Sequence, residues 1–198
     1  MKTLFMDTAW KNLVLVLMED GQIVESLSME AFKRQSEELF VELGKLLDQA
    51  GWKLADVDEV MITDGPGSYT GLRIAMTVAK ILGTQSKAKV RTISTLQLYA
   101  GKAPVANVLL DARGHRAYAG HLENGNLIWS GILDLDQVPE FLEQNQGELY
   151  GEGELVSQPA NPSDFAINAR DLLDLAAPVD NVDALCPVYM KESDSYRV

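Results

Sequence analysis

Cysteine and histidine are scarce in this chain, and their scarcity argues against two kinds of site. Cys186 is the single cysteine, so no disulfide can form within the chain, and a lone thiol fits the reducing cytosol. The two histidines, His115 and His121, lie six positions apart, with alanines between them and no third ligand nearby. We therefore expect a cytoplasmic protein without a transition-metal site.

Long apolar runs and a serine-nucleophile motif are also missing. The first residues reach Asp7 before an apolar segment of membrane length forms, so we expect neither a signal peptide nor a membrane span. No G-x-S-x-G sequence is present. Cys186 is followed by a proline and has no obvious base beside it, so the thiol is interpreted as structural. No residue is predicted to be catalytic.

Basic residues become rare in the second half of the chain. The net charge is −12, and residues 1–102 hold 12 basic and 13 acidic residues, a net of −1. Residues 103–198 hold 5 basic and 16 acidic residues, a net of −11. Such a field repels phosphate backbones, so in an RNA pathway another subunit would hold most of the RNA. Solubility alone is an equally adequate interpretation of the acidity.

Apolar periodicity predicts alternating strands and helices of an α/β fold. Helical spacing over 35–50 has Ser36 available as a cap and Gly51 at its exit, and a second helix over 69–82 ends at Gly83. We expect strands over 2–7, 13–18, 23–29, 57–63, 90–94, 105–111, 116–122, 127–133 and 149–151, and helices over 35–50, 69–82, 95–101, 138–144 and most of 162–177.

The two halves of this pattern look alike. Each begins with three strands and continues with a helix and a further strand, and a proline near position 104 marks the change. We predict two duplicated subdomains, 1–103 and 104–198, with the second one reduced.

The ten residues 64–73, D-G-P-G-S-Y-T-G-L-R, are the most informative stretch. Two glycines allow a tight turn after a strand, and the helix that follows offers free N–H groups to an anion. A turn whose glycines serve packing alone is the open alternative, and the Walker spacing is absent. The candidate phosphate-binding residues here are Gly65, Gly67, Ser68, Thr70, Gly71 and Arg73.

The helix after this loop is apolar on nearly every side. Its only charged residues up to Gly83 are Arg73 and Lys80, and a helix of this kind must be buried on nearly all sides. Small residues at 71, 75 and 79 recur every fourth position and form a groove that another backbone can approach. Either the second half of the chain or a partner chain covers it.

Two aspartates occupy matching places in the two halves. Asp7 follows the first strand, and Asp111 follows the first strand of the second half, where carboxylates of nucleotide-binding folds contact metal and phosphate. The segment 151–153, G-E-G, could line a sugar or a base. The alternative is that all of these are ordinary turn residues.

Several motifs together resemble the TsaB (YeaZ) family. The loop 65–74 resembles the family signature, with Tyr69 where phenylalanine is usual, and Gln35 stands where a histidine is frequent. The resemblance covers essentially the whole chain and is tight over residues 57–113. The supporting matches are M-D-T-A at 6–9, S-E-E-L at 36–39, S-T-L at 94–96, D-A-R at 111–113 and P-V-Y-M-K at 187–191.

The resemblance implies an actin/hexokinase-like (ASKHA) fold and a non-catalytic scaffold role. The family acts with TsaD, the catalytic subunit, and TsaE, an ATPase, in threonylcarbamoylation of adenosine 37 of tRNA, and touches tRNA only through the complex. TsaD carries an H-x-x-x-H metal pair, which this sequence lacks. The two N-terminal helices would bind TsaD or form a homodimer. The expected interface residues are Leu39, Leu43, Gly71, Leu72, Ala75, Met76 and Ala79.

Two other functions are weighed against this one. A small-molecule phosphotransferase would hold Mg–ATP with Asp7, the loop 65–71 and Asp111, although the short second half leaves little room for an adenine pocket and offers no clear general base. Direct RNA binding is disfavoured by the acidic half. No cofactor is firmly indicated, and ATP or ADP with Mg at a subunit interface is the candidate left open.

Overall fold

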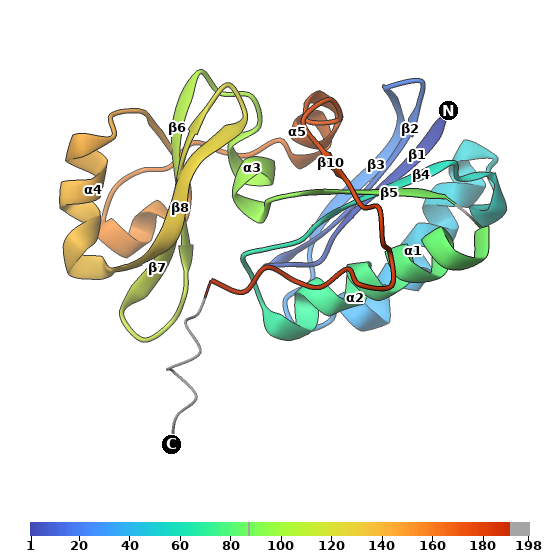
Figure 1. Ribbon diagram of the computed structural model, residues 1–198, viewed down its shortest axis with the longest axis horizontal. Helices are drawn as coiled ribbons and strands as arrows, with labels where there is room; N and C mark the ends of the chain where they lie inside the picture. The colour runs from blue at the N-terminus through green and yellow to red at the C-terminus, as the bar shows by residue number, and fades with distance from the viewer. Residues whose placement is uncertain (87, 191–198) are drawn as a thin grey trace.

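The computed structural model describes residues 1–86 and 88–190, and they form two β-sheets side by side with helices between and around them (Figure 1). The first sheet has the order β10-β5-β4-β1-β2-β3 and the second the order β8-β7-β6-β9. The strands are β1 (Lys2–Asp7), β2 (Asn12–Glu19), β3 (Gln22–Glu30), β4 (Glu59–Thr63), β5 (Lys89–Ile93), β6 (Val105–Asp111), β7 (Arg116–Glu123), β8 (Asn126–Asp134), β9 (Glu148–Gly151) and β10 (Ala177–Pro178).

The two sheets repeat one topology. In the first, β1, β2 and β3 form an antiparallel meander, and β4 then pairs with β1 in parallel. In the second, β6, β7 and β8 form the same meander, and β9 pairs with β6 in parallel. The first sheet alone adds β5 beside β4, so the repeat is shorter in the second. This is the predicted actin/hexokinase-like α/β fold. The boundary at 103/104 stays a prediction, and β10 returns to the first sheet from the far end of the chain.

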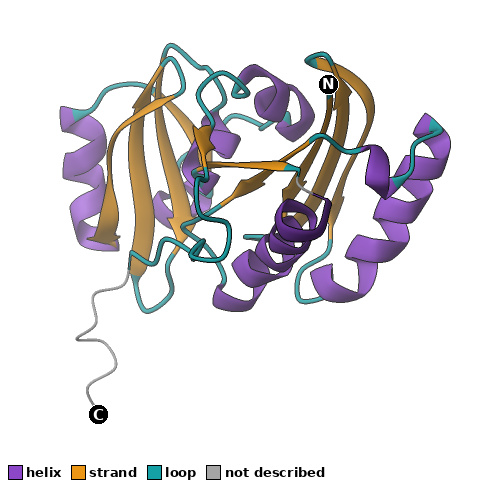
Figure 2. Ribbon diagram, turned by 45° about the vertical axis from the view of Figure 1, so that its right-hand side comes forward, coloured by secondary structure: helices purple, strands orange, loops and turns teal. Residues whose placement is uncertain are grey.

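Strands β1 and β2 are buried on both faces, which explains their unbroken apolar sequences. Successive side chains of a strand point to opposite faces. Leu4 and Met6 therefore join the core beneath α1 (Gln35–Ala50) and α2 (Tyr69–Ile81), whereas Phe5 joins the core on the other side, beneath α5 (Phe165–Asp171). The helices thus cover both faces of the first sheet, as Figure 2 shows.

The short helix α3 (Thr95–Ala100) joins the two sheets. Leu98 packs into the first-sheet core, and Leu96 and Tyr99 pack against the second sheet. The opposite face of the second sheet is covered by α4 (Val138–Gln144), through Val138. Figure 1 shows α3 between the sheets and α4 at the outer edge. Because one small helix supplies side chains to both cores, the sheets share a packed interface rather than a linker.

Three details of the predicted helices are wrong. Ser36 does not cap α1: Arg34 is the cap residue, without a side-chain bond, and its carbonyl accepts the first N–H groups. Beyond Ile81 the chain continues into a π turn, Leu82–Ser86, instead of ending at Gly83. The helix expected over 162–177 is only α5, because the Asp164 side chain accepts from the Ile167 N–H and starts the helix there.

The last described segment, Val179–Met190, is a strap that runs along α2. The Val179 N–H bonds to Val90 O at 2.9 Å, and the Lys80 ammonium donates to Asp183 O at 2.9 Å. Val182 and Leu185 pack against the first-sheet core. The strap is the last stretch of ribbon before the grey trace in Figure 1. Lys191, the end of the tail motif, lies outside the described residues.

The small-residue groove of α2 is covered within the chain. Gly71, Ala75 and Ala79 are buried, and the last two belong to the first-sheet core. The apolar circumference of α2 therefore has three internal neighbours, namely the sheet, α1 and the strap. Within the described residues, no helix is both long enough and apolar enough to cross a membrane.

Candidate functional site

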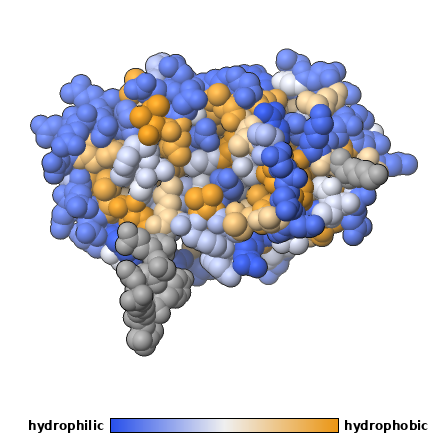
Figure 3. All heavy atoms as spheres, viewed as in Figure 1, coloured by the Kyte–Doolittle hydropathy of each residue, from blue (hydrophilic) through white to orange (hydrophobic). Residues whose placement is uncertain are grey.

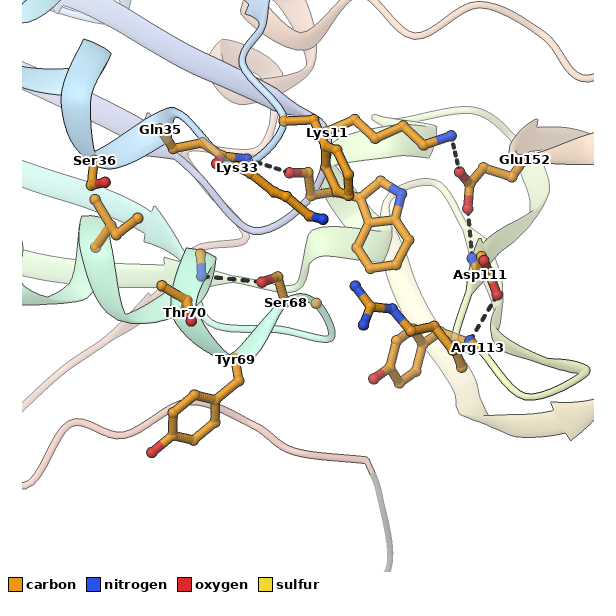
Figure 4. A pocket seen from close by; sticks show the side chains of 17 residues that line it. Lys11, Lys33, Gln35, Ser36, Ser68, Tyr69, Thr70, Asp111, Arg113 and Glu152 are labelled. Atoms are coloured by element: carbon orange, nitrogen blue, oxygen red, sulfur yellow. Dashed lines mark hydrogen bonds and ion pairs between the residues drawn. The ribbon is translucent and has the colours of Figure 1, made fainter.

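A cleft of about 540 Å³ lies where the loop before α2 faces the second sheet (Figure 4). One wall comes from the turn after β1, the residues before α1, and the first turn of α2. The other wall comes from the ends of β6 and β9. The lining residues are Trp10, Lys11, Phe32, Lys33, Gln35, Ser36, Gly67, Ser68, Tyr69, Thr70, Gly71, Ile74, Asp111, Ala112, Arg113, Tyr118 and Glu152.

The glycine loop is held against the turn that follows β1. The Ser68 N–H donates to Ala9 O at 2.8 Å, and a Cβ on Gly67 would lie 2.6 Å from the same oxygen. Ser68 is also the cap of α2, because its Oγ accepts from the Gly71 N–H at 3.3 Å. Close backbone approach thus requires glycine at position 67, and the serine hydroxyl is partly engaged in capping.

A buried threonine ties the same turn to α2. The Thr8 hydroxyl donates to Gly71 O at 2.6 Å, and its oxygen accepts from the Ala75 N–H at 3.1 Å. Any Cβ on Gly71 would lie less than 3.0 Å from Thr8 O. The spacing of glycines in the loop therefore follows from two backbone contacts with residues 8 and 9.

An ion pair crosses the floor of the cleft. Lys11, from the first sheet, pairs with the buried carboxylate of Glu152, which also accepts from the Asp111 N–H at 2.6 Å. The Asp111 carboxylate accepts in turn from the Arg113 N–H at 2.7 Å. Figure 4 shows this chain of contacts from Lys11 to Arg113. The pair with Glu152 raises the pKa of Lys11 and joins the two halves of the chain electrostatically.

The structure brings together five of the eight predicted phosphate-site residues. Gly67, Ser68, Thr70, Gly71 and Asp111 line the cleft. The other three do not. Gly65 faces the strap, where a Cβ would lie 2.5 Å from Val188 O. Arg73 is exposed, and its guanidinium donates to the Tyr69 hydroxyl at 2.9 Å.

Asp7, the third of these residues, is buried beneath the turn. Its carboxylate accepts from the Thr63 hydroxyl and from the Ala9 N–H at 3.1 Å. Burial raises the pKa of Asp7 to about 6, although the two hydrogen bonds oppose the shift. This carboxylate does not line the cleft, so it cannot reach a metal ion there.

The cleft therefore suits an anion better than a metal-bound nucleotide. Lys33 and Arg113 bring positive charge to its walls, and the glycine loop brings hydroxyl groups. Two nearby carboxylates are engaged elsewhere, Asp7 with Thr63 and Glu152 with Lys11, whereas the Asp111 carboxylate lines the cleft. Among the residues described here, no group of three or more His, Cys, Asp or Glu side chains could hold a metal ion.

Sequence reasoning singled out the segment 151–153 but missed Lys11 and Lys33. Lys11 reaches Glu152 from 141 positions away, and no local pattern marks such a contact. The backbone of Lys33 has a φ of 64°, which turns the chain just before α1. A lysine in the left-handed backbone conformation leaves no signature in composition or periodicity. Neither lysine could therefore be identified from the sequence.

All seven residues expected at a partner interface are buried in this chain. Gly71 is buried, and the other six residues, two on α1 and four on α2, are at most 3% exposed. Their side chains face the sheet, so a partner on these helices would contact the outward side. There α1 exposes Phe40 and Val41, and α2 exposes Ile81, with exposed fractions of 62%, 53% and 50%.

The comparisons with known proteins agree on one family. The family model described as TsaD: tRNA N6-adenosine threonylcarbamoyltransferase matches residues 28–144. The chain belongs to this family. Curated relatives named tRNA threonylcarbamoyladenosine biosynthesis protein TsaB are among those it matches, and the chain is a TsaB-type member.

The TsaB relatives are distant and match in part. The protein of Buchnera aphidicola subsp. Schizaphis graminum is 31% identical over 117 residues, which cover 56% of each chain. That of Bacillus subtilis is 26% identical over 138 residues, covering 68% of this chain and 58% of the relative. That of Escherichia coli is 27% identical over 160 residues, covering 75% and 69%. The match thus spans little more than half the length of the first two relatives.

Solved structures support the same fold. YeaZ from Pseudomonas aeruginosa superposes with a TM-score of 0.77 at 22% identity, over 95% of this TsaB-type chain and 99% of YeaZ. A second protein, described as similar to peptidase YEAZ from the same organism, has a TM-score of 0.75 at 24% identity, over 96% and 99% of the two chains. At this level of sequence identity, the structural similarity supports the fold alone.

Proposed function

We propose that this chain is the non-catalytic, partner-binding subunit of the machinery that makes threonylcarbamoyladenosine in tRNA. Its partner would be a TsaD-type catalytic subunit, with a TsaE-type ATPase in the same assembly. The names of the curated relatives, tRNA threonylcarbamoyladenosine biosynthesis protein TsaB, support the pathway. The observation that carries the partner role is the set of apolar side chains exposed on α1 and α2.

The outward face of the two helices has the form of a helix-docking surface. On α2 the exposed positions are 69, 70, 73, 77 and 81, which follow the helical repeat and form one stripe. On α1, Phe40 and Val41 lie one helical turn before Gly44. No atom lies within 4 Å of a Cβ built on Gly44. Exposed aromatic and aliphatic anchors beside an open glycine let a partner helix approach closely. We call the exposed residues of α1 and α2 the α1–α2 face.

The net charge supports the proposal that another subunit binds the tRNA. The chain carries −12 overall, and most of that charge comes from its second half. A polyanion gains little from such a surface, because binding to a nucleic-acid backbone depends on neutralising phosphates with lysine and arginine. In this proposal the chain positions or activates its partner, and the partner binds the RNA.

Charging the α1–α2 face tests the proposal. Phe40→Glu or Ile81→Glu should weaken binding to the TsaD-type subunit from the same source by about 30-fold or more, the effect of removing an interface anchor. Isothermal titration or light scattering of the mixture measures the affinity. Ile128→Glu is the matched control, because Ile128 is an equally exposed aliphatic residue on β8, in the other sheet.

Both charged residues would be exposed, so the variants should stay folded, and thermal unfolding checks this. Equal affinity for Phe40→Glu and Ile128→Glu would contradict the assignment of the face. Homodimers of the isolated chain, if they use the same face, should disappear in Phe40→Glu and persist in Ile128→Glu.

A nucleotide remains a separate proposal for the cleft, and it would bind without a metal. The loop residues Ser68 and Thr70, together with Lys33 and Arg113, support anion binding there. We expect ADP to bind the isolated chain with the same affinity in EDTA as in Mg, and Arg113→Ala to weaken it several-fold. Binding that requires Mg would contradict this arrangement of carboxylates.

A further inference from the structure

The strap Val179–Met190 ends on the glycine loop. The Val188 N–H donates to Asp64 O at 2.8 Å, which gives the loop a backbone contact with a residue 124 positions away. Val188 O occupies the space where a Cβ of Gly65 would be, and Gly65 has a φ of +137°. The first glycine of the loop thus belongs to the strap contact, whereas Gly67 and Gly71 face the turn after β1.

An aromatic stack follows directly. The Tyr189 ring lies on the Tyr69 ring, with centroids 5.5 Å apart and planes 20° apart. Tyr69 opens α2 and lines the cleft, and the Arg73 guanidinium lies 5.1 Å from its ring centroid. Tyr69 is therefore held between an arginine of its own helix and a tyrosine of the strap.

The next residue of the strap reaches the other half of the molecule. Met190 packs against the second-sheet core, in the cluster that contains Tyr118 and contacts Trp10. Both of these aromatic residues line the cleft. Figure 1 shows the strap passing from α2 towards the lower end of the second sheet. Two successive side chains, Tyr189 and Met190, thus contact opposite sides of the cleft.

These contacts are exposed at their edges. Val188 and Tyr189 are 50% and 47% exposed. On this side of the molecule the space-filling view shows apolar and polar residues intermixed on the surface (Figure 3). A segment with half-exposed side chains, held within the described residues by the backbone hydrogen bond from Val188 to Asp64, opens at low cost compared with the core. The Lys11–Glu152 pair ties the same two halves at the cleft floor.

We propose that the end of the strap, Val188–Met190, is a releasable clasp that holds the mouth of the cleft closed by joining the first turn of α2 to the second sheet. With the clasp in place, Tyr69 is fixed and the two halves are tied at the mouth. On release, Tyr69 becomes free and the halves separate at the mouth, while the Lys11–Glu152 pair holds the floor. The proposal concerns the isolated chain and does not depend on its partner or its pathway.

Each anchor of the clasp can be removed singly. Tyr189→Ala removes the stack on Tyr69, and Met190→Asp places a charge against the second-sheet core. Val188→Ala is the matched control, because it trims a neighbouring exposed side chain and keeps the N–H that donates to Asp64. The variants are made in the full chain, and denaturant unfolding verifies that each remains folded.

Two measurements follow the clasp and the cleft separately. Hydrogen exchange at the Val188 amide reports release, and we expect it to accelerate by about tenfold or more in both anchor variants. Pulsed electron paramagnetic resonance between spin labels at Asp48→Cys on α1 and Glu143→Cys on α4, with Cys186→Ser, reports the separation of the halves. Positions 48 and 143 are exposed.

The expected result is a longer and broader distance distribution in Tyr189→Ala and Met190→Asp, and a parental one in Val188→Ala. Faster exchange at Val188 with an unchanged distance distribution would overturn the proposal, because the strap would then be a passive cover. An unchanged exchange rate in both anchor variants would overturn it as well, since neither side chain would be holding the strap.

Discussion

Replacing Gly71 by alanine should destabilise the chain by about 3 kcal/mol or more, because an overpacked site with displaced backbone costs this much or unfolds. A Cβ there would collide with Thr8 O, a backbone atom of a fully buried residue that cannot rotate away. The collision would also separate the Thr8 hydroxyl from Gly71 O and the Ala75 N–H. Urea unfolding monitored by circular dichroism measures the change in midpoint.

Gly44→Ala is the control, because Gly44 also lies inside a helix but has open space around it. Alanine has the higher helix propensity, so Gly44→Ala should stabilise the isolated chain by about 0.5–1 kcal/mol. The two substitutions add the same methyl group and should act in opposite directions. If Gly71→Ala were as stable as the parent, the packing of α2 on the turn after β1 would be wrong.

Asp7→Asn should make the chain more stable at neutral pH, by an amount that grows with pH. Burial raises the pKa of Asp7 from 3.8 to about 6, so the folded state binds this proton more tightly than the unfolded chain. The stability that Asp7 contributes is complete below the unfolded pKa and is lost as the pH rises through about 6. A shift of about two units corresponds to about 3 kcal/mol.

The test is the difference in unfolding free energy between Asp7→Asn and the parent, measured at pH 4 and at pH 7.5. Any loss of hydrogen-bond geometry in asparagine is the same at both values and cancels. We expect the difference to move in favour of asparagine by about 2–3 kcal/mol between the two. Asp48→Asn, on the exposed side of α1, gives the background of a surface substitution. A constant difference would show that Asp7 is not a buried, uncompensated carboxyl group.

The sequence predicted more of the fold than of the candidate site. The unbroken apolar residues of β2 predicted a strand covered on both faces, and its interior is buried on both. The helix predicted over 35–50 is confirmed to the residue, with Gly51 in the left-handed conformation at its end. Such elements are recorded in local periodicity and capping, which a single sequence displays.

Which side of a helix faces inward was harder to infer. The groove of Gly71, Ala75 and Ala79 was interpreted as open to the second half or to a partner, yet it packs on the first sheet and on Thr8. Small residues indicate that another segment approaches the helix closely, but they do not identify that segment. The strap that covers another side of α2 lies 100 positions further along the chain, and no short-range pattern connects the two.

The site shows the same limit. The glycine loop was recognisable, because turn chemistry is local, and four of its six candidate residues meet Asp111 in one cleft. Asp7 was expected to reach phosphate, but the turn buries it against Thr63. The Lys11–Glu152 pair and the Tyr69–Tyr189 stack join residues more than 100 positions apart. Such contacts arise from tertiary packing and leave no trace in spacing.

We propose the α1–α2 face as the surface by which this chain binds a catalytic partner. The most direct measurement is the mass, by light scattering, of the purified chain mixed with the TsaD-type subunit from the same source, for the parent, Phe40→Glu and Ile128→Glu. We expect a heteromer for the parent and for Ile128→Glu, and separate species for Phe40→Glu. A heteromer that forms equally well with Phe40→Glu, or no heteromer with the parent chain, would contradict it.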